Sequence, residues 1–433
     1  MCIWIYTHIV TVPVGLYQIH EKQNPKMYIM DEQTYNYVIF FLGVCGMVFY
    51  LFMAFLSLLS LIGSHFYLYR RVDPKLMVEE VPGVSIVKPL MGVDSLLEVN
   101  LESHFTLEYP KFELLICVQD DQDPAINLYN KMKEKYPKVD TRLFIGGKDG
   151  IINPMVHNMA PGYDNAKYDF IWISTSRIKA STESLYDMAT KLMKPNVGLV
   201  HQLPFTTDQK GLAASVEKIY FGSNVGKFYT SFNFLGVPLL TGMSYIFKKS
   251  VLEEVNGLSW FGRYLAEDYF LSQAIHAKGY RIVLSAFPAQ QNVSGLTLTG
   301  FKDRMVRWLR LRLNMITFVS GVMEPLAECF PSAVIGALCA YHFFGINPYY
   351  FFAGHVCGWI VLDYLHLCNA QGGSVPFSKL QFLLAWITRE LINYYVYFEA
   401  LMNPRRIKWG KRTYKVTLGG HTEIAREKGS IPL

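Results

Sequence analysis

Hydrophobic positions divide the chain into a long apolar segment, a middle region of short apolar runs, and an apolar C-terminal third. Val38 to Ile62 is nearly continuous apolar sequence without a charged residue, and it is long enough to cross a bilayer as a helix. The aromatic and basic run from Tyr67 to Arg71 predicts that the domain after this span lies on the cytosolic side. We therefore expect residues 38–69 to form a transmembrane anchor and residues 1–37 to be an N-terminal extension.

The C-terminal third contains three more apolar stretches, which run roughly Pro331–Ile346, Tyr349–Leu367 and Leu380–Met402. The last carries Arg389-Glu390 in its middle, a charged pair that is costly to place inside a bilayer. If the basic tail and the middle region share the cytosolic side, an even number of crossings separates them. One stretch is therefore expected to be re-entrant or interfacial. We assign residues 316–402 to a membrane-associated region and residues 403–433 to a basic cytosolic tail.

The middle region, residues 80–315, alternates β-rich runs with helical patterns. The expected strands are Val84–Val87, Phe112–Val118, Thr141–Ile145, Asp169–Ile173 and Gly198–His201, and two expected helices are Asp123–Tyr136 and Ser181–Met193. This alternation predicts an α/β fold with a mostly parallel sheet and helices on both of its faces. Ligands bind such sheets beyond the carboxyl ends of the strands, which is where Asp94 falls. The acidic cluster of Asp120, Asp121 and Asp123 also falls there, but we interpret it as a solvated loop and helix cap.

Composition supports a membrane protein rather than a soluble one. Of the 433 residues, 51% are hydrophobic and only 18% are charged. The net charge of +6 fits an anionic leaflet or a diphosphate substrate, but it is too small to indicate nucleic-acid binding. The seven cysteines show neither CxxC nor Cys/His spacing, so we expect neither a disulfide framework nor a zinc site.

One carboxylate pair and one Arg-x-x-Arg-Trp box carry the strongest chemical signal. Glu267-Asp268 precedes Arg304, Arg307 and Trp308, and a helix would place both arginines on one face. Sugar transfer from a nucleotide donor needs a base for the attacking hydroxyl and fixed positive charge for the departing diphosphate. The acidic pair also fits a helix N-terminus. The arginines also fit a basic amphipathic helix on a membrane surface, because two more arginines follow.

These motifs occur with several others in an order that resembles the ceramide glucosyltransferases. The matching runs include Val84–Leu90 with Gly92-Val93-Asp94, Cys117–Asp120, Arg142–Lys148, Ile152–Pro154, Gly198–His201, Thr241–Ser244, Ala266–Phe270, Arg304–Trp308, Gln371–Gly373 and Phe377–Leu380. The resemblance implies a GT-A-type, Rossmann-like nucleotide-sugar transferase domain over residues 80–315, with membrane helices before and after it. It also implies a multi-pass protein of the Golgi or another secretory membrane, with the catalytic domain facing the cytosol.

The resemblance further implies the reaction and the roles of single residues. Glucose would pass from UDP-glucose to ceramide with inversion, giving a β-glucoside. Asp94 would bind the uridine end of the donor, and Asp268 would be the general base. His201 would lie near the substrates. Arg304 and Arg307 would meet phosphate oxygens, and Trp308 would pack under a sugar or at the interface.

The sequence departs from the family where a divalent cation, Mg²⁺ or Mn²⁺, would be held. Thr175 stands at the position of the second family aspartate, and Arg177 stands where the family has glycine. A neutral hydroxyl is a poor ligand for a hard dication. Three consequences stay open: an inactive protein, weak activity with metal held by the diphosphate and other carboxylates, or an Arg177 guanidinium that takes over the electrostatic role of the metal.

Two other functions compete with the enzyme hypothesis. An inactive family member that binds ceramide or partner proteins is favoured by Thr175. A processive polysaccharide synthase would share the carboxylate and the arginine box. Such a synthase needs enough spans to enclose a channel, and the few apolar segments speak against it.

Overall fold

The structure is a computed structural model that describes residues 31–70, 81–410 and 412–425. The chain divides into two units, residues 1–45 and residues 46–433. In the first unit, the described residues from 32 to 45 belong to the N-terminal part of helix α2 (Glu32–Tyr67). Most of the expected N-terminal extension, residues 1–30, lies outside the described part of the chain. Everything below concerns the second unit.

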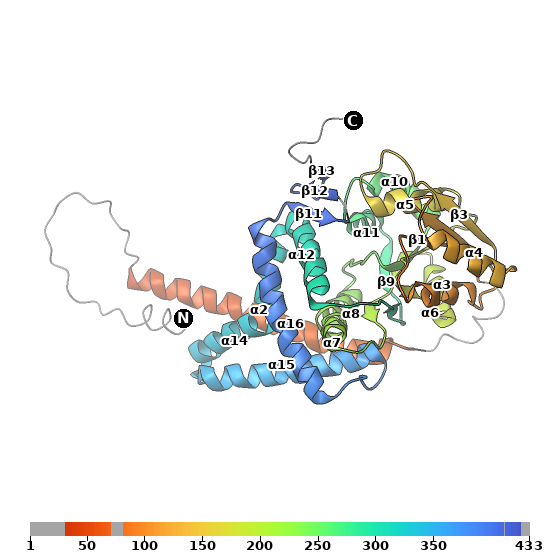
Figure 1. Cartoon of the computed structure of the whole chain (residues 1–433). Coiled ribbons are helices and arrows are strands. Elements are labelled where there is room, and N and C mark those ends of the chain that lie inside the picture. The colour runs from red at the N-terminus through yellow and green to blue at the C-terminus, as the bar shows by residue number, and fades with distance from the viewer. Residues whose placement is uncertain (1–30, 71–80, 411, 426–433) are drawn as a thin grey trace, which may run out of the picture. The chain divides into compact units, whose positions relative to one another are not determined.

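A seven-stranded sheet forms the centre of this unit, in the order β3-β2-β1-β4-β8-β6-β9 (Figure 1). The strands are β1 (Val84–Leu90), β2 (Phe112–Val118), β3 (Thr141–Ile145), β4 (Phe170–Ser174), β6 (Val197–His201), β8 (Ser244–Lys248) and β9 (Arg281–Leu284). All five predicted strands are present, and the predicted α/β fold is confirmed. The sheet is parallel from β3 to β4, but β8 runs antiparallel to both of its neighbours.

Helices cover both faces of the sheet because side chains alternate along each buried strand. Ile86 and Leu114 point into one apolar core, and Val87 and Leu115 point into the other. The first core is closed by α3 (Leu97–Phe105), α4 (Ala125–Lys135) and α6 (Thr182–Leu192). The second is closed by α5 (Pro154–Asp164), α9 (Lys249–Glu253), α10 (Gly257–Phe261) and α11 (Glu267–Ala277). The carboxyl ends of β1, β2 and β4 therefore meet at one edge, where a ligand site is expected.

A small second sheet lies beside the carboxyl end of β4. It has the order β5-β10-β7, formed by β5 (Ile178–Lys179), β7 (Pro204–Thr206) and β10 (Ala289–Gln291). After β7 the chain forms α7 (Leu212–Ile219), the π-helix η2 (Tyr220–Val225) and α8 (Gly226–Leu235). After β10 it enters α12 (Leu298–Met315), which carries the arginine box. The small sheet thus joins the turn after β4 to the helix with the arginines.

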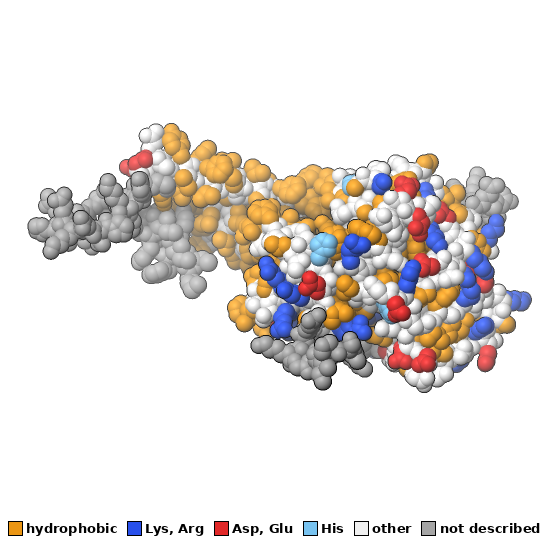
Figure 2. Space-filling view, turned by 90° about the horizontal axis from the view of Figure 1, so that it is seen from above, with side chains coloured by type: hydrophobic (Ala, Val, Ile, Leu, Met, Phe, Trp, Pro, Cys, Tyr) orange, Lys and Arg blue, Asp and Glu red, His pale blue; other side chains and the backbone are white. Residues whose placement is uncertain are grey.

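The C-terminal apolar stretches fold as η3 (Val319–Met323), α13 (Glu324–Leu326), α14 (Cys329–Phe344), α15 (Pro348–Gln371) and α16 (Lys379–Met402). By length and composition, α2 and α15 are each able to cross a membrane, and the bent segment Val319–Phe344 is a third candidate. Helix α16 does not qualify and contacts α7 and α12 instead. Figure 2 shows apolar side chains along the candidate membrane helix α2 and charged side chains over the α/β domain.

The charged pair in the middle of α16 is buried among partners from other helices. Arg389 donates from Nη2 to Asp363 Oδ2 on α15 at 2.8 Å and from Nη1 to Ser223 Oγ at 2.9 Å. Trp386 Nε1 donates to the same Asp363 oxygen at 2.8 Å. Arg389 and Glu390 are each 1% exposed and lie in direct contact. Arg389 thus has carboxylate partners inside the protein, while Arg389 Nε and Glu390 Oε2 have no hydrogen-bond partner among the described residues.

The basic tail forms a third, antiparallel sheet of β11 (Arg406–Trp409), β12 (Arg412–Val416) and β13 (Thr422–Ile424). Ile407, Tyr414 and Val416 are buried in an apolar cluster with Leu265 and Leu311. Asn314 Nδ2 donates to the Pro404 carbonyl at 2.8 Å, and Gly419 N donates to the Asn314 carbonyl at 2.8 Å. The segment after α16 thus packs against the start of α11 and the C-terminal half of α12.

Candidate active site

Glu267 and Asp268 begin helix α11, where the helix dipole favours negative charge. Asp268 Oδ2 accepts a hydrogen bond from Gly242 N at 2.5 Å, and Oδ1 accepts one from Tyr269 N at 2.8 Å. A Cβ at position 242 would lie 3.0 Å from Asp268 Oδ2, so this close approach needs glycine. The Asp268 carboxylate is partly exposed and fixed in orientation by the backbone.

Glu267 is more deeply buried than its neighbour, at 3% exposure. Asn153 Nδ2 donates to Glu267 Oε2 at 2.6 Å. Burial raises the pKa of Glu267, and the negative charge of Asp268 raises it further. Burial also raises the pKa of Asp268, although the two backbone N–H groups partly offset the shift. Over the pH range in which Asp268 is ionised and Glu267 is still protonated, the pair therefore carries one negative charge.

Asp268 lies next to the turn that follows β4, because strand β8 joins them. Ser244 pairs with Ser174 in the sheet, and Thr175 N donates to the Met243 carbonyl at 3.1 Å. Gly242, one residue before Met243, holds Asp268. The predicted base and the position of the missing family aspartate are therefore brought to the same edge of the sheet.

The arginine box lies on α12, as predicted, and its members have different surroundings. Arg304 Nη2 lies 2.7 Å from Glu217 Oε1 on α7, and the side chains are 12% and 1% exposed. The Arg307 guanidinium lies 5.3 Å from the centre of the Trp409 ring. Burial, followed by repulsion from Arg304 and Arg177, lowers the pKa of Arg307 to about 10. Arg304 therefore has a buried counter-ion, whereas Arg307 is surrounded by other cations.

The Trp308 side chain is partly buried and packs against an apolar core cluster. Its ring centre lies 6.1 Å from that of Phe221, and the Arg304 guanidinium lies 6.0 Å from the Trp308 ring. Trp308 thus lies within cation–π distance of the Arg304 guanidinium. Its role under a sugar stays a prediction.

The membrane-surface reading of α12 does not account for the two arginines after the box. Arg312 Nε donates to Glu324 Oε1 at 3.0 Å, and Arg310 Nη2 donates to the Glu399 carbonyl at 2.9 Å. Leu309, Leu311 and Leu313 are buried between them. Arg310 and Arg312 are therefore engaged by α16 and α13, whereas Asp303 on the same helix is exposed, and the membrane-surface reading of α12 stays a prediction.

Asp94 lies in the exposed loop after β1, where its Oδ1 accepts a hydrogen bond from Leu96 N at 2.7 Å. Asp123 accepts hydrogen bonds from Gly92 N, at 2.8 Å to Oδ2, and from Ala125 N, at 2.8 Å to Oδ1. The predicted capping role of Asp123 therefore fits its contacts, and Asp123 also fixes the loop that carries Asp94. Burial, followed by repulsion from Arg304, lowers the pKa of the Arg177 guanidinium, and the charges of Glu217 and Asp94 partly offset this shift.

His201 ends β6 and is 3% exposed. Its ring centre lies 5.6 Å from that of Tyr229, and burial lowers the pKa of His201 to about 3, so the imidazole is neutral. The Tyr229 hydroxyl is hydrogen-bonded to Thr241, the residue before Gly242. His201 is thus separated from Asp268 by a layer of side chains, and its substrate-binding role stays a prediction.

A buried lysine lies beneath the turn of residues 175–178. Lys88 is fully buried in β1, and its Nζ donates to the Thr175 carbonyl at 3.0 Å and to the Ile178 carbonyl at 3.4 Å. His104 Nε2 lies 3.4 Å from the same Nζ and 2.9 Å from Ser174 Oγ. Burial lowers the pKa of Lys88 well below its usual range. The carbonyls of Thr175 and Ile178 thus point inward, toward Lys88 Nζ. This group contacts no carboxylate in the described part of the chain.

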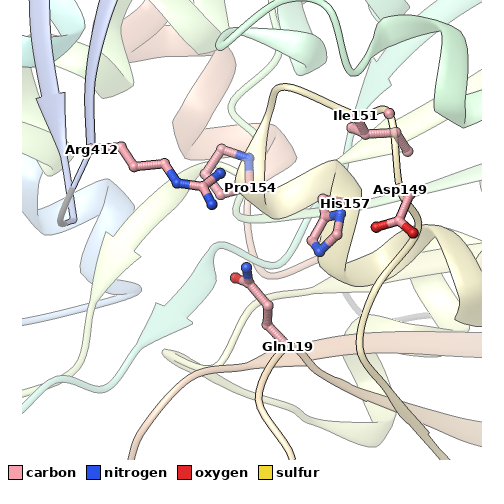
Figure 3. A pocket seen from close by; sticks show the side chains of 7 residues that line it. Gln119, Asp149, Ile151, Pro154, His157 and Arg412 are labelled. Atoms are coloured by element: carbon pink, nitrogen blue, oxygen red, sulfur yellow. The ribbon is translucent and has the colours of Figure 1, made fainter. Parts of the chain in front are cut away.

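A pocket of about 210 Å³ lies near the carboxyl end of β2 (Figure 3). It is lined by Gln119, Asp149, Gly150, Ile151, Pro154, His157 and Arg412. Arg412 extends into it from the C-terminal sheet, opposite Pro154 and His157 at the start of α5 (Figure 3). None of the predicted site residues lines this pocket, but Asn153, which binds Glu267, is adjacent to Pro154.

Sequence reasoning missed Lys88, Glu217, Tyr229 and Trp409, which contact or flank the predicted residues. Lys88 had a readable signal, because it is the one charged residue in the strand VSIVKPL. Trp409 is the one tryptophan of the basic tail, where Tyr414 is also aromatic. Glu217 and Tyr229 lie on helices with no local motif, and only the fold places them beside Arg304 and Thr241.

The sequence model of glycosyl transferase family 21 matches residues 47–422. The chain belongs to glycosyl transferase family 21. Its relatives include ceramide glucosyltransferase 3 of Caenorhabditis elegans, which is 37% identical over 88% of this chain and 82% of its own length. Ceramide glucosyltransferase 1 of the same organism is 34% identical over 90% of this chain and 83% of its own length. The resemblance recognised from the motifs is thereby confirmed.

Solved structures with a similar arrangement are more distant. A mannosyltransferase from Pyrobaculum calidifontis, solved with GDP-Man and Mn²⁺, is 17% identical, with a TM-score of 0.49 over 84% of this chain and 98% of that one. The Staphylococcus aureus TarS fragment solved with UDP-GlcNAc is 13% identical, with a TM-score of 0.38 over 81% of this chain and 98% of that one.

Proposed function

We propose that this family 21 glycosyltransferase transfers glucose from UDP-glucose to ceramide with inversion, giving glucosylceramide. The observation that carries the proposal is the carboxylate of Asp268, oriented by Gly242 N and Tyr269 N at the same sheet edge as the turn of residues 175–178. The choice of sugar and lipid is supported by the two Caenorhabditis elegans relatives, which are named as ceramide glucosyltransferases and match most of the chain.

In the proposed reaction, the primary hydroxyl of ceramide attacks the anomeric carbon of glucose while the bond to the diphosphate breaks. Asp268 takes the hydroxyl proton, and UDP leaves from the opposite face, so the product is a β-glucoside. Burial raises the pKa of Asp268, which makes the carboxylate a stronger base than an exposed aspartate. Charge that develops on the diphosphate is stabilised by fixed cations, of which Arg307 lacks a carboxylate partner among the described residues.

The membrane helices fit a lipid acceptor. Helix α15 and the bent segment Val319–Phe344 begin after α12, the helix with the arginine box. We propose that the acceptor hydroxyl is presented at the membrane interface, with the α/β domain and the C-terminal sheet on the cytosolic face of a Golgi or related secretory membrane. The basic residues that follow α2 support this orientation, although Arg71 and Lys75 lie outside the described residues.

The test is transfer of radiolabelled glucose by the purified chain in nanodiscs that contain ceramide. UDP-glucose is expected to give labelled glucosylceramide, and nanodiscs with diacylglycerol or cholesterol in place of ceramide are expected to give none. Faster transfer from UDP-galactose would contradict glucose as the transferred sugar, and faster transfer to another lipid would contradict ceramide as the acceptor.

One observation favours a second candidate function, an inactive family member that binds ceramide. Thr175 supplies no carboxylate at the position where the resemblance implies one. If the Thr175→Asp variant transfers glucose and the natural chain does not, this second function is the correct one.

A further inference from the structure

The turn of residues 175–178 carries positive charge where the family resemblance implies a divalent cation. Thr175 stands at the position of the family aspartate and Arg177 at that of the glycine, and the buried Lys88 amine lies beneath the turn. The Arg177 guanidinium is solvent-accessible and interacts electrostatically with Arg304, Glu217 and Asp94. Arg177 is therefore within electrostatic reach of the arginine box.

The residues around the turn do not fit a bound dication. Mg²⁺ and Mn²⁺ select several oxygen ligands, above all carboxylates. The described residues contain no group of three or more histidine, cysteine, aspartate or glutamate side chains arranged to hold a metal. Glu217 is engaged by Arg304, and the Thr175 carbonyl accepts a hydrogen bond from Lys88. A dication bound at this turn would also be repelled by the positive charges of Arg177, Arg304 and Arg307.

The backbone that carries Arg177 is held by a buried network of asparagines. Asn292 N donates to the Arg177 carbonyl at 2.8 Å, and Asn100 Nδ2 donates to the Ser176 carbonyl at 3.2 Å. Asn292 Nδ2 returns a hydrogen bond to Asn100 Oδ1 at 2.9 Å. Lys88 secures both ends of the turn from below. A cation on such a preorganised support needs little rearrangement when charge develops on a leaving group.

Arg177 and Arg307 are also the cations that remain available to an anionic ligand. Arg304 has its buried partner Glu217, whereas neither Arg177 nor Arg307 has a carboxylate within ion-pair distance in the described part of the chain. A guanidinium presents a planar set of donors that matches two phosphate oxygens, which a lysine does not.

We propose that the Arg177 guanidinium, together with Arg307, replaces the divalent cation on the nucleoside diphosphate, so that this chain transfers its sugar without a metal. The inference rests on the proposed function for the sugar and the acceptor, but not for the binding of the diphosphate. Arg177 contacts the diphosphate as the bond to the anomeric carbon breaks, and UDP leaves with its charge balanced by arginine.

The experiment measures UDP binding by calorimetry and glucosyl transfer, both on the full chain in nanodiscs and with EDTA present throughout. The natural chain is expected to bind UDP and transfer glucose equally well with EDTA and with added Mn²⁺. Arg177→Gly, which introduces the family glycine, is expected to weaken UDP binding by about 10- to 100-fold, as for loss of a charged hydrogen bond. It should lower kcat by about 10²- to 10³-fold, as for a lost transition-state donor.

Three further variants control the result. Lys138→Gly removes an exposed cation from the turn before β3, at the amino ends of the parallel strands. It is expected to change neither UDP affinity nor kcat. Arg177→Lys keeps the charge without the planar fork and should fall between the natural chain and Arg177→Gly. Thr175→Asp combined with Arg177→Gly restores the family pattern, and its activity should require Mn²⁺ and be abolished by EDTA.

The outcomes separate this inference from the proposed function. Metal-independent UDP binding that needs Arg177 supports the inference even if no glucose reaches ceramide, in which case the proposed function fails alone. Glucosylceramide synthesis that stops with EDTA and resumes with Mn²⁺ overturns the inference alone. The inference is also overturned if Arg177→Gly binds UDP and transfers glucose as well as the natural chain.

Discussion

Replacing Asp268 by asparagine removes the proposed base while keeping the shape of the side chain. General-base catalysis contributes about 10²- to 10⁴-fold to a rate. At about 1.36 kcal/mol for each tenfold, Asp268→Asn should raise the activation barrier by about 2.7–5.4 kcal/mol. UDP affinity should change little, because the contacts of Asp268 are with Gly242 N and Tyr269 N rather than with the arginines.

The same contacts set the expected loss of stability. Each Asp268 oxygen accepts one backbone N–H, from Gly242 at 2.5 Å and from Tyr269 at 2.8 Å. Asparagine has one acceptor oxygen, so one N–H group would face the amide nitrogen and lose its partner. The cost of an unsatisfied donor is about 1–3 kcal/mol, which thermal unfolding in detergent should detect.

The matched control is Asp169→Asn, at the amino end of β4 and so at the opposite edge of the sheet. Asp169 accepts hydrogen bonds from Ser250 N at 2.7 Å and from Ser250 Oγ at 3.0 Å. In this variant the amide oxygen can still accept from Ser250 N and the amide nitrogen can donate to Ser250 Oγ, so both stability and kcat should change little. If Asp268→Asn retains more than about a tenth of kcat, or if Asp169→Asn loses as much, Asp268 is not the base.

Three other substitutions test the surroundings of the site. Glu267→Gln should stay active, and it should remove the loss of stability that the natural chain shows as pH rises through the raised pKa of Glu267, because the buried amide stays neutral at every pH. Glu217→Ala should cost about 3–5 kcal/mol of stability by leaving Arg304 buried without its counter-ion. Asp363→Ala should cost a similar amount, about 3–5 kcal/mol, because Arg389 and a tryptophan both donate to this carboxylate.

Each of these has a decisive contrary result. An inactive Glu267→Gln chain would make Glu267, rather than its neighbour, the proton acceptor. Glu217→Gln and Asp363→Asn keep an acceptor oxygen and should be less destabilised than the alanine variants in thermal unfolding. If alanine and amide variants unfold at the natural temperature, the ion pairs at Arg304 and Arg389 contribute nothing to stability.

The elements predicted with the best boundaries are those whose pattern is local and strongly apolar. Strands β2 and β3 begin and end at the predicted residues, because β-branched and aromatic runs are bounded there by polar turns. Strands β8 and β9, of 5 and 4 residues, were not predicted, and length alone does not account for this because β3 also has 5 residues. The positions of these two strands in the sheet depend on partner strands far along the chain. The antiparallel direction of β8 depends on the same partners.

The fold of the basic tail was readable in part but was not predicted. Ile407 and Trp409 alternate with basic residues in β11, and Tyr414 and Val416 do so in β12, which is the period of a strand with one buried face. The net positive charge of the segment obscured this pattern. Without the rest of the fold, nothing indicated that the buried face would meet Leu265 and Leu311.

The site was predictable as a set of residues but not as a network. Spacing placed Arg304 and Arg307 on one helix face, and that geometry is present. Their different environments depend on Glu217 and Trp409, which come from distant segments. In the same way, the exchange of aspartate for Thr175 was visible in the sequence, but the support of the turn by Lys88 and the asparagines is a product of tertiary structure.

The most direct test of the account is the product formed by the purified natural chain from UDP-glucose in nanodiscs that contain ceramide. Mass spectrometry and the NMR coupling of the anomeric proton identify the lipid and its linkage. The account predicts β-glucosylceramide, which requires attack by the lipid hydroxyl opposite the departing UDP. An α-linked product, or hydrolysis of UDP-glucose without any glycolipid, would contradict it.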